Sequence, residues 1–458
     1  MEKKHSESFV AVIPIILFMC TFFGAGIFCA SIGIDKPFAQ FPASMGAYIA
    51  LISAFILVKG TLSDKFDWML KSIAQNNVFI PVVVLALAGG FSAVTKGIGG
   101  VDAIVALCLK YVPTSVVTAG FFVVGSIISL ASGSSATTVV AIAPVALTFA
   151  SSAGISLPLM LGTIMGSAMF GNSCSPVSDC TIVSNSIIGL GTKKGPTDKL
   201  ISQLTIYAGP YLLTVILLFI FGRSSGTAVG LETAADAINL PAIIPYILIL
   251  ILAFSGINFV LTLSAGIFVG LVIGVAQSTF DLLNGFQTIA NGMYGMANMI
   301  LLFIFMGGTV GIVAAGGGIE WIVAHLTKLI KGRKSAEAVV LILNGLLVFL
   351  VGNDTIPMMT LGSVIKDIAH RYKLDARRVA ALMPIGTASM AVIVPYTGAS
   401  LTAASYLETN TFSLSFVEGI PYDWFVLLVL FFTVISIFIP FANKRFEKDP
   451  WDYEEWIM

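Results

Sequence analysis

The chain repeats one pattern at about half its length, and this feature constrains its fold more than any other. The glycine-rich segment 89–102 recurs 218 positions later at 307–320. After a slip of one residue, Pro176 pairs with Pro395. A repeat of this length predicts two duplicated halves that pack against each other. A functional site is expected where the two copies meet.

Composition indicates the solvent around this fold. The chain is 57% hydrophobic and only 10% charged, with a mean hydropathy of +0.98. Soluble globular domains are typically about 25% charged, so the composition predicts an integral membrane protein. The formal net charge is zero, so no overall positive charge attracts nucleic acid.

Hydropathy and loop charge together predict how the chain crosses the membrane. Loop 370–378 holds four basic residues, whereas its counterpart 151–157 carries no charge. At the far end of each copy, 192–199 is basic, whereas 408–421 contains no Lys or Arg. Because basic loops stay on the cytoplasmic side, the two halves are predicted to be inverted relative to each other. A crossing helix needs about 20 apolar residues, which predicts simple crossings at 9–35, 42–59, 77–96, 203–222, 240–256, 257–275, 294–315 and 422–442.

Two further regions in each half do not have the pattern of simple crossings. Segments 115–150 and 336–369 are each predicted to begin and end on the same side, as helical hairpins. Segments 158–190 and 379–407 are predicted to cross once, as broken helices. The predicted fold is an all-α integral membrane protein, an inverted repeat of two five-crossing halves, each with a helical hairpin and a broken transmembrane helix. The expected divisions are a first membrane repeat at 1–222, an extracytoplasmic linker at 223–239, a second, inverted repeat at 240–442 and a cytoplasmic tail at 443–458.

Polar residues interrupt the first broken helix in the middle of its predicted crossing. Segment 171–179, Gly-Asn-Ser-Cys-Ser-Pro-Val-Ser-Asp, holds seven polar or helix-breaking residues in nine. Pro176 removes a backbone donor and frees a carbonyl oxygen. Non-helical backbone at this depth is tolerated only where it faces protein or a water-filled cavity. We therefore interpret the segment as a cation site, whose oxygen donors would be Asn172, Ser175, Ser178 and Asp179. A kinked helix whose polar groups only satisfy one another stays an alternative.

Two carboxylates, Asp179 and Asp354, are predicted deep in the membrane. A charge at that depth costs about 2.5–3.5 kcal/mol on insertion scales, so such residues usually have a function. Asp354 would lie at an interface instead if its hairpin reached fully across. The predicted hairpin tips should face the broken helices near the midplane, which adds further candidates to the site: Ser134, Ser135, Asn353, Thr355 and Thr397.

These residues resemble a known family. Segment 171–181 is similar to the signature of the NhaC-type sodium/proton antiporter family, in which a Ser-Pro-Leu-Ser-Asp-Thr-Thr core is typical. Ser-Gly-Ser-Ser at 132–135 and Pro-Tyr-Thr at 395–397 fit the same family, so the similarity covers most of the chain. The tips also resemble motifs by which the wider ion-transporter superfamily holds sodium and, in some members, a carboxylate substrate. This chain departs from the family at Asn172, where an acidic residue is common, and the departure puts proton coupling in doubt.

The resemblance implies a secondary active transporter, and sodium/proton antiport by alternating access is the expected function. A midplane carboxylate, preferentially Asp179, would hold either a proton or Na⁺. The expected Na⁺ ligands are Asp179, Ser178 and Asn353, because a hard ion prefers oxygen donors.

Two alternatives stay open. One is Na⁺- or H⁺-coupled transport or exchange of a small organic anion or amino acid on the same fold. The other is an enzyme, a membrane-embedded aspartyl protease, to which an inverted duplication gives little support. The expected partners are Na⁺, H⁺ and the lipid bilayer, with no cofactor and no nucleic acid; an organic substrate and a homodimer stay open. The expected location is the cell inner (plasma) membrane, as a multi-pass protein with both termini cytoplasmic.

Overall fold

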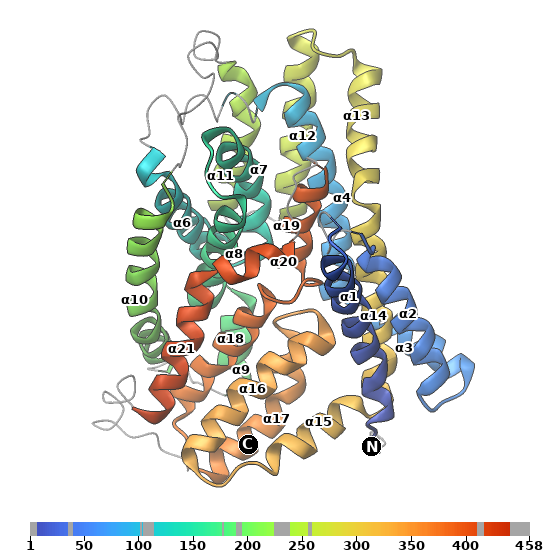
Figure 1. Ribbon diagram of the computed structural model, residues 1–458, viewed down its shortest axis with the longest axis vertical. Coiled ribbons are helices and arrows are strands. Elements are labelled where there is room, and N and C mark those ends of the chain that lie inside the picture. Colours follow the sequence, from blue (N-terminus) through green and yellow to red (C-terminus); the bar gives the residue numbers. More distant parts are fainter. Residues whose placement is uncertain are drawn as a thin grey trace.

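The structure is a computed structural model, which describes residues 7–34, 40–100, 103, 114–175, 178–188, 195–223, 239–254, 259–409 and 416–439. Within these ranges the chain forms helices and no β-strand. Figure 1 shows α10 and α21 at one side of the molecule and α1, α2 and α14 at the other. The hairpins and broken helices lie between these two groups.

The helices of the first half begin near the N-terminus and end at residue 221. Their order follows the predicted crossings, hairpin and broken helix. Their bounds are η1 (Val10–Val12), α1 (Ile13–Ser31), α2 (Ala43–Leu57), α3 (Leu62–Ile73), α4 (Asn76–Gly97), α6 (Thr114–Ser132), α7 (Ser135–Ala153), α8 (Leu157–Cys174), α9 (Asp179–Ile188) and α10 (Gly195–Phe221).

The helices of the second half follow the same order. A shift of 219 residues carries both ends of α6 onto both ends of α16, and the starts of α8 and α9 onto those of α18 and α19. Their bounds are η3 (Leu240–Ile243), α11 (Ile244–Phe254), α12 (Phe259–Ala276), α13 (Leu282–Gly295), α14 (Ala297–Ala315), α15 (Gly318–Thr327), α16 (Arg333–Val351), α17 (Ile356–Arg371), α18 (Ala376–Ala391), α19 (Gly398–Thr409), α20 (Phe416–Gly419), η4 (Ile420–Tyr422) and α21 (Trp424–Phe438).

The hairpin turns of the two halves share one backbone conformation. Gly133 follows α6 and Gly352 follows α16, and each has a φ of 65°. The amide of each donates to the carbonyl oxygen four residues earlier, at 2.8 Å, which ends the preceding helix. Because only glycine adopts this left-handed conformation at little cost, the paired glycines account for the matching turns.

The repeated glycine pairs lie where helices cross closely. A Cβ on Gly89 of α4 would lie 2.3 Å from the Gly292 carbonyl oxygen of α13. A Cβ on Gly308 of α14 would lie 2.8 Å from Met69 Cγ of α3. The Ser72 hydroxyl of α3 donates to the Gly307 carbonyl oxygen at 2.7 Å. The glycines therefore let α13 pack on α4 and α3 pack on α14, so each half contributes a helix to the other.

The hydropathy analysis did not predict α3 and α13. Both helices are amphipathic, and α3 contains Asp64, Lys65, Asp67 and Lys71, which lower its mean hydropathy. Thr61 caps α3 through a reciprocal capping box with Asp64. A capping box is readable in a sequence, so this helix could have been predicted from its N-terminus.

The outer surface of the molecule is apolar, as expected of a protein in lipid. Large side chains such as Ile56, Leu212 and Phe268 are 73%, 64% and 66% exposed. Among the described residues, five helices are long and apolar enough to cross a membrane, and the bent pair Phe416–Tyr422 with Trp424–Phe438 would make a sixth. Four other predicted crossings coincide with shorter apolar helices: Ala43–Leu57, Val82–Gly97, Leu240–Ile249 and Val260–Ala276.

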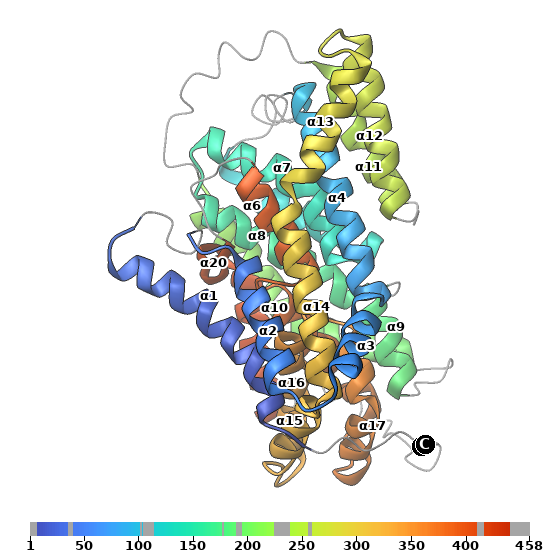
Figure 2. The same ribbon diagram turned by 90° about the vertical axis from the view of Figure 1, so that its right-hand side faces the viewer.

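The two hairpins lie toward opposite ends of the long axis. Figures 1 and 2 both show α6 and α7 in the upper half of the molecule, and α16 and α17 at its lower end. Two predicted segments cannot be compared with the structure. Tail 443–458 and most of linker 223–239 lie outside the described residues.

Candidate functional site

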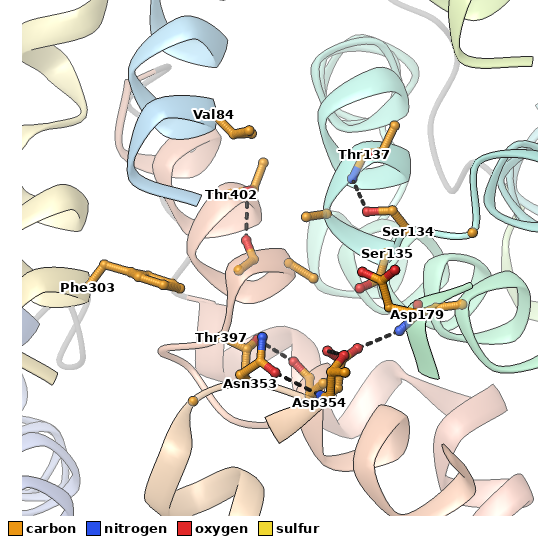
Figure 3. Close-up of a pocket in the computed structure, with 18 of the residues that line it drawn as sticks. Val84, Ser134, Ser135, Thr137, Asp179, Phe303, Asn353, Asp354, Thr397 and Thr402 are labelled. Carbon is orange, nitrogen blue, oxygen red and sulfur yellow. Dashed lines mark hydrogen bonds between the residues drawn. The ribbon is translucent and has the colours of Figure 1, made fainter. Parts of the chain in front are cut away.

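A cavity of about 330 Å³ lies where the two hairpin tips meet the two helix breaks. The tips contribute Ser134 and Asp354, and the breaks contribute Asp179 and Thr397 (Figure 3). All four come from different chain segments, two from each half. The structure therefore brings the candidate residues of both repeats to one place.

Part of the cavity lining is apolar. This part, called the apolar wall below, includes Val84 and Leu85 of α4, Phe303 of α14 and Met359 of α17. Figure 3 shows Phe303 on the opposite side of the cavity from Asp179. Among the described residues that line the cavity, none is Lys, Arg or His. The cavity thus combines two carboxylates and several hydroxyls with a hydrocarbon surface.

Asp354 is held in place by the first broken helix. The Asn172 amide nitrogen donates to Asp354 Oδ2 at 2.6 Å, which joins the end of α8 to the tip between α16 and α17. The neighbouring Asn353 has a different role, because its Oδ1 accepts from the amides of Thr355 at 2.7 Å and Ile356 at 3.0 Å. Asn353 therefore shapes the turn that starts α17, and leaves Asp354 directed into the cavity.

Asp179 is the first residue of α9, and its side chain is exposed in the cavity. Its carboxylate makes no hydrogen bond or ion pair with any residue in the described ranges. The preceding Ser178 fixes this position, since its hydroxyl donates to the Asn172 carbonyl oxygen at 2.5 Å and accepts from the Cys180 amide at 3.2 Å. Ser178 thus closes the break and caps α9.

The first break begins directly after α8. The Ser175 amide donates to the Gly171 carbonyl oxygen at 2.7 Å, and the Ser178 amide donates to the Ser175 carbonyl oxygen at 3.3 Å. Ser175 and Ser178 are both fully buried and do not line the cavity. Pro176 lies outside the described residues. The predicted residues that do line the cavity are Ser134, Ser135, Asn172, Asp179, Asn353, Asp354, Thr355 and Thr397.

The second break is held by hydroxyl groups. The Thr397 hydroxyl donates to the Ala391 carbonyl oxygen and lies 3.0 Å from the Ser400 hydroxyl. The Tyr396 hydroxyl donates to the Phe349 carbonyl oxygen, and its ring packs edge-on against Phe18 at 4.9 Å between centroids. This break therefore places no carboxylate in the cavity.

Four helices begin at the cavity. Ser134 caps α7 by accepting from the Thr137 amide at 3.3 Å, and α9, α17 and α19 begin at or next to Asp179, Thr355 and Gly398, which line the cavity. Helix N-termini carry a partial positive charge. Asp179 and Asp354 stand at two of them, and there the partial charge stabilises an ionised carboxylate. The starts of α7 and α19 carry only small and hydroxyl side chains.

The sequence analysis missed two features of this region. The residues of the apolar wall could not be recognised in the sequence, because apolar residues that face a cavity and apolar residues that face lipid look alike in a membrane-crossing segment. The sequence analysis also did not identify two other carboxylates that are buried in the protein, Asp423, which is 3% exposed, and Glu337, which is 4% exposed. Glu337 pairs with Arg378, a contact between residues far apart in the chain.

Lys199 was assigned to a basic cytoplasmic loop, and this was wrong. Its side chain is 0% exposed within α10, and its amine donates to the Thr181 hydroxyl of α9 at 3.3 Å. A count of loop charges treats every lysine alike, so it could not distinguish this one.

Curated relatives span nearly the whole chain. A malate-2H(+)/Na(+)-lactate antiporter of Bacillus subtilis (strain 168) is 21% identical over 442 residues, which are 90% of this chain and 92% of that protein. The Na(+)/H(+) antiporter NhaC of the same organism is 24% identical over 86% of this chain and 91% of its own length. The Na(+)/H(+) antiporter NhaC of Alkalihalophilus pseudofirmus is 20% identical over 80% of this chain and 85% of its own length.

Two solved structures also align with nearly all of the chain. The YdaH transporter of Alcanivorax borkumensis is 14% identical over 97% of this chain and 99% of its own, with a TM-score of 0.38. MtrF of Neisseria gonorrhoeae is 13% identical over 94% of this chain and 95% of its own, with a TM-score of 0.39.

A family model gives the assignment. The model of the Na+/H+ antiporter family matches residues 6–223 and 228–440, nearly the entire chain. This confirms the resemblance drawn from segment 171–181, and it agrees with the apolar helices and with the two relatives named NhaC. The protein is therefore a multi-pass membrane transporter that belongs to the Na+/H+ antiporter family.

Proposed function

We propose that the protein exchanges Na⁺ for H⁺ across the membrane, with Asp179 and Asp354 as the carboxylates that the two ions share. The observation that carries this proposal is that two acids from different halves line one cavity without any basic side chain among its described residues. Two carboxylates that share a site repel each other when both are ionised. A proton or a cation relieves this repulsion, so occupancy by one ion excludes the other.

The neighbouring residues suit this role. Asn172 stands where the family commonly has an acid, and its amide donates to Asp354 at 2.6 Å. It therefore positions the carboxylate and cannot itself carry the proton. Ser134 and Ser135 line the same cavity and supply hydroxyl oxygens, which Na⁺ accepts as ligands. Ser178 and Asn353 would support the cation indirectly, by shaping the break and the tip.

The proposed transport cycle needs two inverted halves. The repeat is supported by the 219-residue shift between matching helices, and its inversion is supported by the opposite ends at which the two hairpins lie (Figure 2). In transporters built from inverted halves, alternating access is largely a rocking or gating of one repeat against the other around a fixed site. The basic loop 370–378 supports an orientation with both termini in the cytoplasm. We infer that the protein works in the cell inner (plasma) membrane.

Ion flux in proteoliposomes tests the proposal. A Na⁺ gradient is imposed on reconstituted protein while a dye reports lumenal pH, with no organic solute present. Wild type should move protons against Na⁺, and both Asp179→Asn and Asp354→Asn should abolish this movement. Asp67→Asn, which changes an exposed aspartate of α3, is the matched control. Unchanged flux in Asp354→Asn, or no Na⁺-driven flux in wild type, would contradict the proposal.

A second function, coupled exchange of a small carboxylate, is favoured by one specific observation. The starts of α7 and α19 face the cavity without an acidic residue, so their partial positive charge is free to hold an anion. The apolar wall at Phe303 and Met359 would contact the hydrocarbon part of such a substrate. The relative named for malate and lactate supports this alternative. In the same liposomes, proton movement that requires an added C3 or C4 carboxylate would favour it over simple ion exchange.

A further inference from the structure

A buried amine lies behind the first broken helix. Lys199 of α10 is 0% exposed, and its amine donates to the Thr181 hydroxyl at 3.3 Å. Thr181 in turn donates to the Ser173 carbonyl oxygen at the end of α8, at 3.3 Å. These contacts join α8, α9 and α10 on the side of the break away from the cavity. Lys199 has no acidic partner within the described residues.

The surroundings of this amine are polar and incompletely paired. Five buried side-chain atoms near it or on its helix lack a hydrogen-bond partner in the described structure: Ser173 Oγ, Ser202 Oγ, Gln203 Nε2, Gln203 Oε1 and the Tyr207 hydroxyl. Lys199, Gln203 and Tyr207 are spaced by four residues, so they share one face of α10. Buried polar atoms in proteins are normally satisfied by protein or by ordered water. An ordered water bound to these atoms in this pocket would satisfy them and would accept a proton from the amine.

The pocket and the cavity lie on opposite faces of α9. Asp179 and Thr181 are two residues apart on this helix, so their side chains point in nearly opposite directions. Asp179 lines the cavity, whereas Thr181 contacts Lys199. The two titratable groups are thus separated by about the width of one helix, roughly 10 Å. In a poorly solvated interior, charges at this separation influence each other.

We propose that Lys199 is a second proton-binding site of the transporter, which releases its proton when a cation occupies the cavity. The amine is protonated while the cavity is empty, and it then supports the break through Thr181. A cation bound at Asp179 and Asp354 disfavours a second positive charge behind α9. The ammonium becomes a neutral amine, and its proton passes to water in the pocket. This inference rests on the proposed Na⁺/H⁺ exchange, and it adds a proton carrier to the two carboxylates, although Asn172 is not acidic.

The other titratable groups around Lys199 do not take over this role. Cys174 of α8 and Cys180 of α9 face it, and Tyr207 lies further along its own helix. All three are buried and are neutral when protonated. The amine is therefore the group whose charge changes most readily in this pocket.

Proton release on Na⁺ binding tests the proposal directly. NaCl is added to purified protein in weakly buffered detergent solution, and choline chloride serves as the control salt. An indicator dye measures the number of protons released, and a separate titration measures the number of Na⁺ ions bound. Wild type should release protons in proportion to bound Na⁺. In Lys199→Met the number released per Na⁺ should fall by about one at mildly alkaline pH, because the amine is gone. Lys199→Arg should show the same fall, since its guanidinium does not titrate.

Matched variants separate this role from a structural one. Lys65 is another buried lysine, 7% exposed, whose amine donates to the Phe55 carbonyl oxygen at 2.7 Å, and Lys65→Met should leave the proton count unchanged. If Lys199→Met does not fold, Thr181→Val removes the partner of the amine and should shift the pH at which protons are released. Na⁺ binding that depends on Asp354 with an unchanged proton count in Lys199→Met would overturn this proposal alone. A wild type that binds no Na⁺ would overturn both proposals.

Discussion

The two halves arrange the same helices around the cavity but carry their charged side chains in different places. In the second half, the base of the hairpin is fastened by a buried ion pair, in which Arg378 Nε of α18 lies 3.1 Å from Glu337 Oε2 of α16. Arg378 also donates to the Ser436 hydroxyl of α21 at 2.6 Å. The position equivalent to Glu337 in the first half is Thr118, which donates to the Gly222 carbonyl oxygen at 2.8 Å.

The breaks show the opposite distribution. The first break has Asp179 on its cavity face and Lys199 behind it, whereas the second is held by hydroxyl groups such as Thr397. A shared backbone pattern therefore does not require shared chemistry. The glycines and caps preserve the helices of each half, while the ionisable groups stand at the break in the first half and at the tip and base of the hairpin in the second.

The ion pair at the base of α16 gives the largest expected difference in stability between the halves. Glu337→Leu leaves Arg378 buried without its carboxylate, which should cost about 3–5 kcal/mol of unfolding free energy. Thr118→Val removes a neutral hydrogen bond and should cost about 1 kcal/mol. Denaturant unfolding in detergent measures both. Equal losses in the two variants would show that the bases of the two hairpins are fastened equally strongly.

Substitutions at the two breaks should differ in effect, because one should lower Na⁺ affinity and the other should lower stability. Asn172→Ala removes the 2.6 Å hydrogen bond to Asp354. Hydrogen bonds to charged groups are worth about 1.5–3 kcal/mol, so the apparent Na⁺ affinity should fall by about 10- to 100-fold. Thr397→Val should lower stability by about 1 kcal/mol while Na⁺ affinity changes little. Flux measured over a range of Na⁺ concentrations is the readout, and an affinity loss confined to Thr397→Val would reverse the assignment of the two breaks.

Close helix packing should also differ between the halves. A Cβ on Gly171 of α8 would lie 2.2 Å from the Ser129 backbone carbon of α6, so Gly171→Ala should destabilise the protein by about 1–3 kcal/mol. On α16 of the second half, a Cβ on Gly345 would meet the flexible Met390 side chain at 3.0 Å. Gly345→Ala should therefore be close to neutral. Thermal unfolding of both variants tests this, and similar melting temperatures would contradict it.

The smallest expected effect concerns the loops that follow the two hairpins. Gly154 has a φ of 67°, and its equivalent Lys373 has a φ of 50°. A left-handed conformation costs a side-chain-bearing residue about 1–2 kcal/mol. Lys373→Gly should therefore stabilise the fold, by less than about 1 kcal/mol because glycine also gains freedom in the unfolded chain. Gly154→Ala should destabilise it by about 1 kcal/mol. A stabilised Gly154→Ala in thermal unfolding would exclude this backbone argument.

The repeat in the sequence predicted much of the fold. The hairpins predicted at 115–150 and 336–369 are those of α6 with α7 and of α16 with α17, and pairing Pro176 with Pro395 located both breaks. These features were predictable because they depend on local backbone chemistry. Helices α3 and α13 were missed because hydropathy averages over a segment and cannot recognise an amphipathic helix that packs on a partner.

The candidate site was predicted in outline. The polar residues at the tips and breaks converge on one cavity, as expected, because their positions follow from the repeat. Ser175 and Ser178 turned inward to satisfy the broken backbone, which depends on dihedral angles that a sequence does not show. The apolar wall at Phe303 and the burial of Lys199 depend on contacts between distant segments, so neither could be predicted.

The meeting of the two hairpin tips has a consequence for the electrical behaviour of the protein. The hairpins approach from opposite ends, and Asp179 and Asp354 line the cavity where their tips meet. Each elementary charge that crosses the whole membrane gains or loses about 2.3 kcal/mol at 100 mV. If the proposed cycle carries a net charge across, its rate should therefore depend on the membrane voltage.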